Sequence, residues 1–364
     1  MTRVLQLLDI DAGFQAQRGV LYLSRDTGAG FTSQVRTIGR GGDFRSGPVA
    51  FAELRRTAGE FDICHAWGMR ALTAAALAGG KARIVYSPTA FPTPHTLRWL
   101  RAIMTYRDVQ VISPTATLRR ALVERGVPLE QCHLIRPGVE FSRIRRRRNS
   151  DLRAALGFTD ADRVLLLGGE STRESAQEEA VWAASILHTL DTKYKVLFWG
   201  RGPRSAAMER FARNARQPML LSVAQTRLGR AVEFEELLPA TDVVLVTARR
   251  PAGMLEACIC MAAALPIVAT VWPTVRELLE DRHTALMAVS GSPRGLARRV
   301  LDLEEDPNLQ WAISDMARTE AYEFFSLTRF LSQFRSVYTQ LAAGGKVEVP
   351  EQAPGAGMRF HGRG

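Results

Sequence analysis

Short apolar runs alternate with helix-like segments along almost the whole chain, and this alternation restricts the fold more than any other feature. Runs of this length, bounded by Gly, Pro, Asp and Ser, are typical of buried strands in a parallel sheet covered by helices. A first series has expected strands at 3–10, 61–67, 82–88, 108–114 and 132–138, with helices at 48–58, 69–79, 95–104 and 115–126. The sequence therefore predicts an α/β protein.

The same alternation starts again after an arginine-rich segment. The second series has expected strands at 162–170, 195–203, 219–224, 241–248 and 265–270, with helices at 174–190, 204–216, 234–239 and 252–264. Two series of similar size predict two doubly wound, Rossmann-like domains that face each other across a cleft. We place the domains at 1–145 and 150–320, then a C-terminal helix at 321–343 that packs back on the N-terminal domain, and a disordered tail at 344–364.

Composition and cysteine usage narrow the class of protein. No apolar run reaches the roughly 18 residues that a membrane helix needs, and the N-terminus lacks the features of a signal peptide. The 4 cysteines form no C-x-x-C pair, so we expect no metal site and a reducing, cytoplasmic setting. The formal net charge of +11 favours phosphorylated or otherwise anionic partners.

Positive charge is densest in the segment RIRRRR, which runs from Arg143 to Arg148. A solvated linker between the domains explains such a run, and so does contact with anionic lipid headgroups or another polyanion. The second explanation would place a cytoplasmic protein peripherally at the inner membrane face. We expect no specific nucleic-acid partner in either case.

Three stretches together resemble the family 4 glycosyltransferases, which have the GT-B fold. They are VISPTATLRRALVERGVPLEQCHLIRPGVEFSRI (111–144), DICHAWGMRALTAAAL (62–77) and the gapless run 236–289, which includes LEACICMAAALPIVAT. The resemblance implies retaining, metal-independent transfer of a sugar from a nucleotide-sugar donor, held by the C-terminal domain, to a sugar or lipid-linked acceptor on the N-terminal domain. It implies no cofactor. Basic side chains and a helix N-terminus would stabilise the leaving diphosphate as its negative charge grows.

The expected donor side departs from the family pattern in its carboxylates. The family has a Glu, seven residues and a second Glu around the start of the helix, and counting back from ALPIVAT puts Pro251 and Ile259 at these positions. If LEA at 255–257 is the matching triplet instead, the positions hold Ala248 and Glu256. The first carboxylate is missing in either alignment.

Basic residues and glycines of the pattern are replaced as well. Glu170 and Ser175 stand where the family has an Arg and a Lys, and Arg173 between them is our candidate for their role. Glu170 would repel a diphosphate unless another group neutralised it. Ala264 and Arg282 replace family glycines, a residue that often serves positions with positive φ.

The candidate site residues follow from their places in the matched pattern. On the donor side they are Arg173, Gly200, Gly202, Gly253, Glu256 and Glu277. On the acceptor side they are Gly13, Trp67 and His95, and His65 is the candidate catalytic residue. Structural roles also explain several of these: a packed histidine at a strand end, an aromatic residue in the core, or turn glycines.

Functions of different classes remain open at this point. The first is a working glycosyltransferase with an altered donor site. The second is a non-catalytic relative that binds or scaffolds a partner, because losing two hydrogen bonds to charged groups would cost about 10²–10⁴ in transition-state affinity. The third is polyanion binding through the arginine run, with steep salt dependence as its signature.

Overall fold

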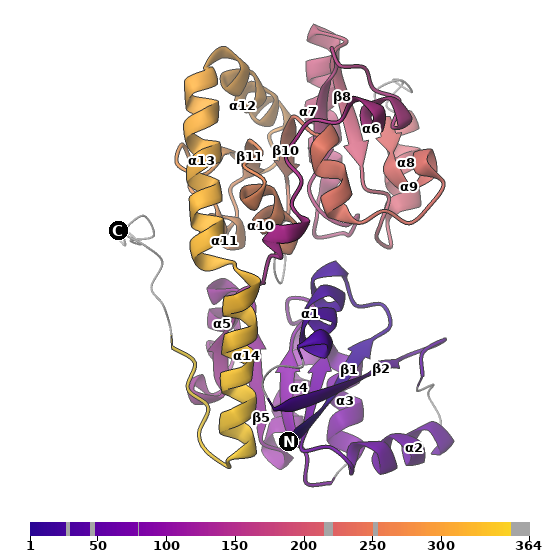
Figure 1. The fold of residues 1–364 in the computed structure, drawn as a ribbon, viewed down its shortest axis with the longest axis vertical. Helices are drawn as coiled ribbons and strands as arrows, with labels where there is room; N and C mark the ends of the chain where they lie inside the picture. Colours follow the sequence, from indigo (N-terminus) through magenta and orange to yellow (C-terminus); the bar gives the residue numbers. More distant parts are fainter. Residues whose placement is uncertain (27–29, 44–47, 79, 215–220, 250–253, 351–364) are drawn as a thin grey trace. The chain divides into compact units, whose positions relative to one another are not determined.

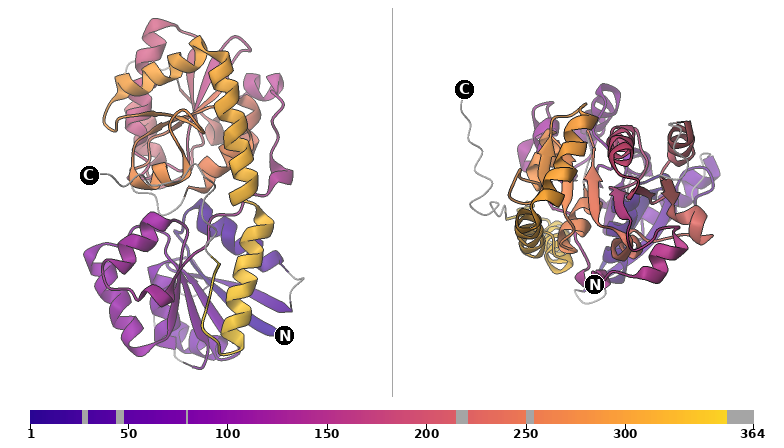
Figure 2. Two further views of the ribbon diagram at one scale, coloured as in Figure 1. Left: turned by 90° about the vertical axis from the view of Figure 1, so that its left-hand side faces the viewer. Right: turned by 90° about the horizontal axis from the view of Figure 1, so that it is seen from above.

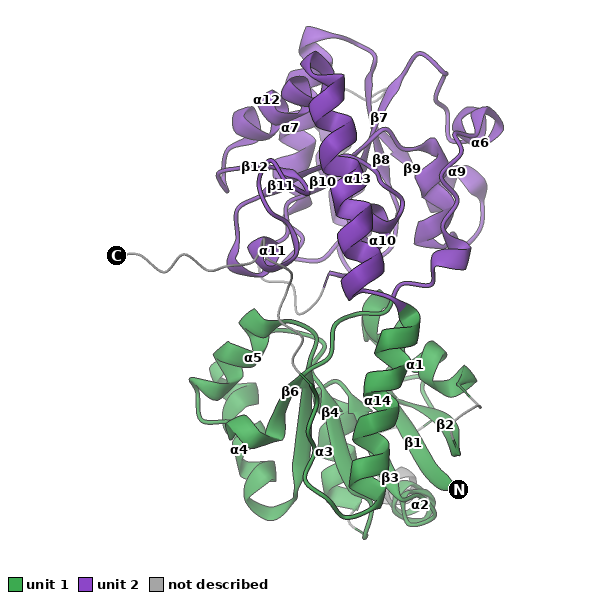
Figure 3. Ribbon diagram, turned by 60° about the vertical axis from the view of Figure 1, so that its left-hand side comes forward, with its two compact units in different colours: residues 1–138, 327–353 green, residues 139–326, 354–364 purple. Residues whose placement is uncertain are grey.

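A computed structural model describes residues 1–26, 30–43, 48–78, 80–214, 221–249 and 254–350 of the chain. The chain divides into two compact units, shown in different colours in Figure 3. Unit 1 holds residues 1–138 together with the C-terminal segment that returns from residue 327, and unit 2 holds residues 139–326. Each unit is built around its own six-stranded parallel sheet.

Unit 1 has its strands in the order β2-β1-β3-β4-β5-β6, with helices packed against the sheet (Figure 1). The strands are β1 (Thr2–Asp9), β2 (Phe31–Ile38), β3 (Ile63–Trp67), β4 (Arg83–Ser87), β5 (Val109–Ser113) and β6 (Cys132–Leu134). The helices are α1 (Phe14–Arg25), α2 (Pro48–Ala58), α3 (Met69–Ala78), α4 (Pro94–Tyr106), α5 (Ala116–Val123), the short η1 (Leu129–Gln131) and the returning α14 (Leu327–Ala342).

Unit 2 has its strands in the order β12-β11-β10-β7-β8-β9. Helices flank this sheet, as the two further views in Figure 2 show. The strands are β7 (Arg163–Leu167), β8 (Tyr194–Phe198), β9 (Leu221–Val223), β10 (Val243–Val246), β11 (Ile267–Thr270) and β12 (Leu286–Ala288). The helices are η2 (Phe141–Arg143), α6 (Ser150–Ala155), α7 (Gln177–Leu190), α8 (Ser205–Asn214), α9 (Ala224–Leu228), η3 (Phe234–Ala240), α10 (Leu255–Ala262), α11 (Pro273–Leu278), α12 (Pro293–Glu305) and α13 (Pro307–Phe324).

The prediction of two doubly wound α/β units is confirmed. Strands β2 and β12 were missed, because β2 is a half-buried edge strand with few apolar residues and β12 has only three residues. Helix α1 was missed as well: no helix was expected between residues 10 and 48, and α1 buries residues along Phe14–Arg25. No helix among the described residues is both long and apolar enough to cross a membrane.

Helix α14 completes the core of unit 1. Its buried residues Phe330, Phe334, Val337, Tyr338 and Leu341 recur at helical spacing and join the hydrophobic cluster of the β1–β3–β4 side of the sheet. Residues 343–350 continue from the helix, and the rest of the tail that we expected to be disordered, 351–364, lies outside the described residues. Val347 is buried in the same cluster, and the Glu348 N–H donates to the Gln340 side chain at 2.5 Å.

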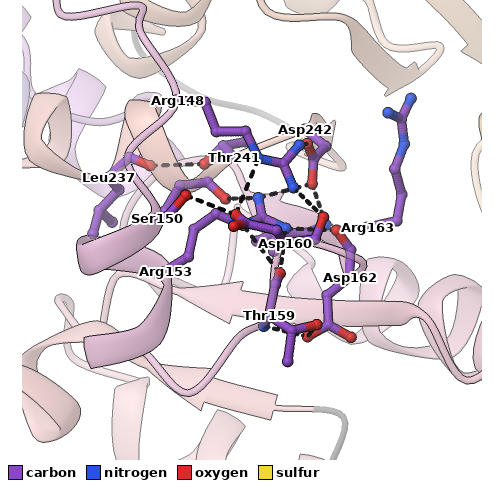
Figure 4. A network of polar contacts seen from close by, with 12 residues as sticks. Arg148, Ser150, Arg153, Thr159, Asp160, Asp162, Arg163, Leu237, Thr241 and Asp242 are labelled. Atoms are coloured by element: carbon purple, nitrogen blue, oxygen red, sulfur yellow. Dashed lines mark hydrogen bonds and ion pairs between the residues drawn. The ribbon is translucent and has the colours of Figure 1, made fainter.

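A buried arginine joins the beginning of unit 2 to the entry of its central strands (Figure 4). The Arg153 side chain is only 1% exposed. It donates to the carbonyl oxygens of Thr159, Asp162 and Ala240 and, at 3.1 Å, to the Asp242 carboxylate. A single side chain therefore donates to three backbone carbonyls in two separate segments.

Helix α10 ends in a left-handed residue that is not glycine. Ala264 has a φ of 51°, and its N–H donates to the Met261 carbonyl at 2.9 Å. The N–H of Leu265 donates to the Cys260 carbonyl at 3.1 Å, which is the bonding of a Schellman C-cap. Arg282 has a φ of 59°. The backbone thus keeps the conformation that suits glycine at both positions where the family pattern has glycine.

We expect Ala264→Gly to raise the free energy of unfolding by about 0.5–1 kcal/mol. The left-handed conformation costs alanine about 1–2 kcal/mol, and the greater freedom of glycine in the unfolded chain offsets part of the gain. Urea denaturation measures the difference. Ala263→Gly is the matched control, because Ala263 has a right-handed φ of −77° and the same change there should destabilise. Destabilisation by both substitutions would contradict the prediction.

Candidate functional site

The strand order of unit 2 reverses between β7 and β10. From β7 the chain continues to β8 on one side and later returns to β10 on the other. Ligands of doubly wound sheets bind beyond the carboxyl ends of the strands at such a switch point. The candidate site is therefore formed by loop 168–176 after β7, by residues 247–249 after β10 and by the neighbouring loop 199–204 after β8.

Loop 168–176 is held in place by both neighbouring loops. The Ser171 N–H donates to the Arg201 carbonyl at 2.7 Å, on the β8 side. On the β10 side, the Thr247 hydroxyl donates to the Ser175 carbonyl at 2.8 Å. The conformation of the loop is thus fixed by the protein itself, which is the preorganisation that a binding site needs.

Gly200 and Gly202 give loop 199–204 its shape. Their φ angles are 86° and 112°, a region that L side chains rarely adopt. A Cβ atom on Gly202 would lie 2.6 Å from the backbone N and O of Ser171, and one on Gly200 would lie 2.7 Å from Val223 Cγ1. Gly202 thus lets this loop approach loop 168–176, and Gly200 lets it approach Val223 in β9. Their part in donor binding stays a prediction.

Two carboxylates and one guanidinium gather at the switch point. Arg201 Nε donates to Glu170 Oε1 at 2.8 Å, and the two side chains are 27% and 13% exposed. Glu256, in the first turn of α10, is half-buried, and its carboxylate accepts a hydrogen bond from the Glu170 backbone N–H. A Cβ atom on Gly169 would lie 3.4 Å from Glu256 Oε1, so this glycine leaves room for the carboxylate.

The surroundings favour the neutral form of Glu256. Burial, and secondly the charge of Glu170, raise the pKa of Glu256 from 4.5 to about 7. Hydrogen bonds from backbone N–H groups and the charge of Arg201 oppose this shift without cancelling it. Near neutral pH the Glu256 carboxyl group therefore exchanges a proton easily, and it can donate or accept a hydrogen bond.

Among the described residues, the structure does not bring the other donor-side candidates together with Glu170, Arg201 and Glu256. Arg173 is exposed and forms no ion pair with another described residue. Glu277 is buried in α11, which follows β11, the strand beyond β10. Gly253 and Pro251 lie outside the described residues, and within the described range α10 begins at Leu255.

Arg201 is the residue that sequence reasoning passed over. It lies in the turn GRGP, which we interpreted only through its glycines. Its pairing with Glu170 provides the neutralising group that this carboxylate needs. An arginine between two glycines, directly after a strand, was the available signal.

His65 lies in the middle of β3 and not at the end of the strand. It is fully buried, and Gln6 in β1 stands beside it in the sheet. Its Nδ1 accepts from the Tyr338 hydroxyl at 2.7 Å, and its Nε2 donates to the Ser87 hydroxyl at 2.8 Å. This tautomer follows because Gln6 accepts from the Trp67 indole N–H and donates to the Tyr338 oxygen, which leaves the Tyr338 proton for His65.

This environment points to a structural role for His65 and gives no support to the catalytic assignment. Burial lowers the pKa of His65 well below 6.5, so the ring is neutral at physiological pH. Both ring nitrogens are bonded inside the core. Trp67 is likewise 6% exposed, and a Cβ atom on Gly19 would lie 2.8 Å from its ring, so it packs in the core and cannot stack on a sugar.

The remaining acceptor-side candidates lie after the carboxyl ends of strands. Gly13 is the N-cap of α1, after β1, and the exposed His95 is the second residue of α4, after β4. Sequence reasoning missed Asp9, the last residue of β1, which accepts hydrogen bonds from the Ala71 and Arg70 N–H groups at 2.7 and 3.3 Å. Burial raises the pKa of Asp9 from 3.8 to about 6.

The arginine segment 143–148 lies along unit 2. Arg146 donates to the Ala263 carbonyl at 2.9 Å, and Arg148 lies 3.1 Å from Asp242. Arg143 is within 3.8 Å of Glu235. Three of its five arginines thus have partners inside unit 2. Contact with an anionic membrane or a polyanion stays a prediction, and the exposed arginines 145 and 147 would carry it.

Comparison with known proteins identifies a family and a curated relative. Residues 161–306 match the family model described as "Glycosyl transferases group 1". N-acetyl-alpha-D-glucosaminyl L-malate synthase from Bacillus anthracis is 22% identical over 190 residues, which are 52% of this chain and 48% of the relative. The match thus spans about half the length of this relative.

Solved structures of similar fold cover nearly the whole chain. Anabaena Alr3699/HepE in complex with UDP-glucose has a TM-score of 0.77 at 16% identity, covering 94% of this chain and 100% of its own. A glycosyltransferase from Rickettsia africae ESF-5 has a TM-score of 0.76 at 14% identity, covering 93% and 98%. The likeness extends over both sheets, and the predicted GT-B fold is confirmed.

Proposed function

We propose that this chain, whose residues 161–306 match the model of the group 1 glycosyltransferases, transfers a sugar from a nucleotide-sugar donor to an acceptor. One observation carries the proposal: the matched residues contain all six strands of unit 2, and with them the switch point between β7 and β10. In this proposal unit 2 holds the donor and unit 1 the acceptor, a sugar or a lipid-linked sugar.

The donor in the proposal is a nucleoside diphosphate sugar. A structural neighbour of this chain was solved with UDP-glucose, which supports this class of ligand. Glu256 is the residue that we assign to the ribose hydroxyls, because its carboxyl group stands at the start of α10 beside the switch point. The transfer in this proposal retains the anomeric configuration and needs no metal or cofactor.

A non-catalytic binding protein is the alternative that the missing carboxylates suggested. The argument for this alternative also assumed that the arginine and the lysine of the family pattern have no replacement in this chain. Arg201 weakens it, because the chain carries a guanidinium next to the position where an arginine is missing. The matched proteins are named as transferases or synthases, and the alternative is not favoured.

Calorimetric titration of the full chain with UDP, GDP and ADP tests the proposal. We expect one of the three to bind saturably, with a Kd of about 1 μM to 1 mM, the usual range for enzyme substrates. Circular dichroism confirms that the protein is folded at the same moderate salt concentration. Absence of binding by all three nucleotides would contradict the proposal. Release of the preferred nucleotide from its sugar conjugate then measures turnover.

A further inference from the structure

We propose that Arg201 binds the donor diphosphate and that Glu170 holds its guanidinium in place until the diphosphate replaces the carboxylate. This inference rests on the proposed function and adds a binding residue to it. The guanidinium lies against the side chain of Glu170, at the position where the family pattern has an arginine. A cation therefore stands beside position 170, although it comes from loop 199–204 and not from loop 168–176.

The chemistry of the side chain suits the role. A guanidinium has five N–H donors in a planar fork, and the 2.8 Å contact with Glu170 is made through Nε. Two phosphate groups linked by a bridging oxygen offer several acceptors at matching spacing, and arginine binds phosphates with two parallel hydrogen bonds. A guanidinium that binds a carboxylate therefore has the geometry to bind a diphosphate in its place.

The backbone of Arg201 is fixed before any ligand arrives. Its carbonyl accepts from the Ser171 N–H at 2.7 Å, and the flanking Gly200 and Gly202 hold the positive φ angles of the turn. The guanidinium carbon lies 5.3 Å from the centre of the Trp199 ring, within the range of a cation–π contact. Binding the diphosphate through Arg201 would therefore require a side chain to change partner and no loop to rearrange.

The charges at the switch point explain why a change of partner is needed. Glu170 and Glu256 are two carboxylates beside one guanidinium. Ser175, at the position of the family lysine, is buried, and its hydroxyl donates to the Thr172 carbonyl at 2.8 Å. An incoming diphosphate therefore competes with Glu170 for Arg201 and is repelled by its charge. Removing that charge should tighten diphosphate binding.

Four variants of the full chain test the inference, with UDP, GDP and ADP and the matching nucleosides as probes. We expect Arg201→Ala to weaken the preferred diphosphate by about 10-fold to 100-fold and to leave its nucleoside unchanged. Glu170→Gln should tighten the diphosphate about 3-fold to 10-fold. Arg204→Ala is the matched control: Arg204 lies on the same loop but pairs with Glu178 at 2.8 Å, and its loss should leave binding unchanged.

The double variant Glu170→Gln/Arg201→Ala shows whether Arg201 contacts the diphosphate or only neutralises the charge of Glu170. It also serves if the single Arg201→Ala variant fails to fold, because it leaves no Glu170 carboxylate without its cation. If Arg201 contacts the diphosphate, the double variant binds it about 10-fold to 100-fold more weakly than Glu170→Gln alone. Equal binding by these two variants would overturn this inference, and so would equal weakening of nucleoside and diphosphate in Arg201→Ala. Absence of any diphosphate binding by the wild type would overturn the proposed function together with it.

Discussion

Arg153→Ala is expected to lower the free energy of unfolding by about 3–5 kcal/mol, the usual cost of removing one partner from a buried ion pair. The Arg153 and Asp242 side chains are only 1% and 9% exposed. The substitution takes a charged donor from Asp242 and from the carbonyls of Thr159, Asp162 and Ala240, of which Ala240 is fully buried. Each unsatisfied buried acceptor adds to the cost.

Urea denaturation measures this effect, and Arg148→Ala is its control. Arg148 also pairs with Asp242 at 3.1 Å, but its side chain is 46% exposed. Surface pairs of this kind contribute about 0–1 kcal/mol. The buried arginine should therefore cost several times more than the exposed one. Equal destabilisation by the two substitutions would show that the network around Arg153 does not stabilise unit 2 as described.

The free energy of unfolding of Glu256→Gln should rise relative to the wild type as the pH increases from about 4.5 to above 7. The pKa of Glu256 is raised to about 7 in the folded chain from an ordinary value of 4.5. The folded state therefore binds the proton more strongly, and the resulting stability is lost as the pH rises through 7. Glutamine does not titrate and loses nothing over this interval.

The expected change in this difference is about 1–3 kcal/mol. A shift from 4.5 to about 7 corresponds to about 3 kcal/mol, and water screens part of it because Glu256 is only half-buried. Urea denaturation of both proteins at pH 5 and pH 8.5, without nucleotide, gives the values. Buried groups such as Asp9 and His65 titrate in both proteins and cancel. A difference that does not vary with pH would contradict the environment described for Glu256.

Most strands with both faces buried were predicted from the sequence, because their residues are mainly apolar. Strands β3, β5 and β10 are examples, and all three are buried along their whole length. The edge strand β2 carries polar residues because one side of it meets solvent, so its pattern was too weak to detect. His65 was misplaced because a buried polar residue within a strand reads as the end of an apolar run.

The sequence predicted where the candidate site lies, at the carboxyl ends of the unit 2 strands, but it predicted only some of the residues found there. The family pattern has glycine at positions 264 and 282, and this sequence has Ala264 and Arg282 there. Both residues nevertheless have a left-handed backbone conformation. Residue types therefore changed while the backbone geometry stayed. The pairing of Arg201 with Glu170 joins loops 31 residues apart in sequence, and no local pattern predicts such a contact.

Amide hydrogen exchange of the full chain, with and without the nucleoside diphosphate that binds in calorimetry, shows directly whether unit 2 holds the donor at its switch point. We expect the diphosphate to slow exchange in loop 168–176 and in loop 199–204, because their backbones adjoin Glu170 and Arg201. Slowed exchange confined to unit 1, or unchanged exchange in both loops at saturating nucleotide, would contradict a donor site at the carboxyl ends of β7 and β10.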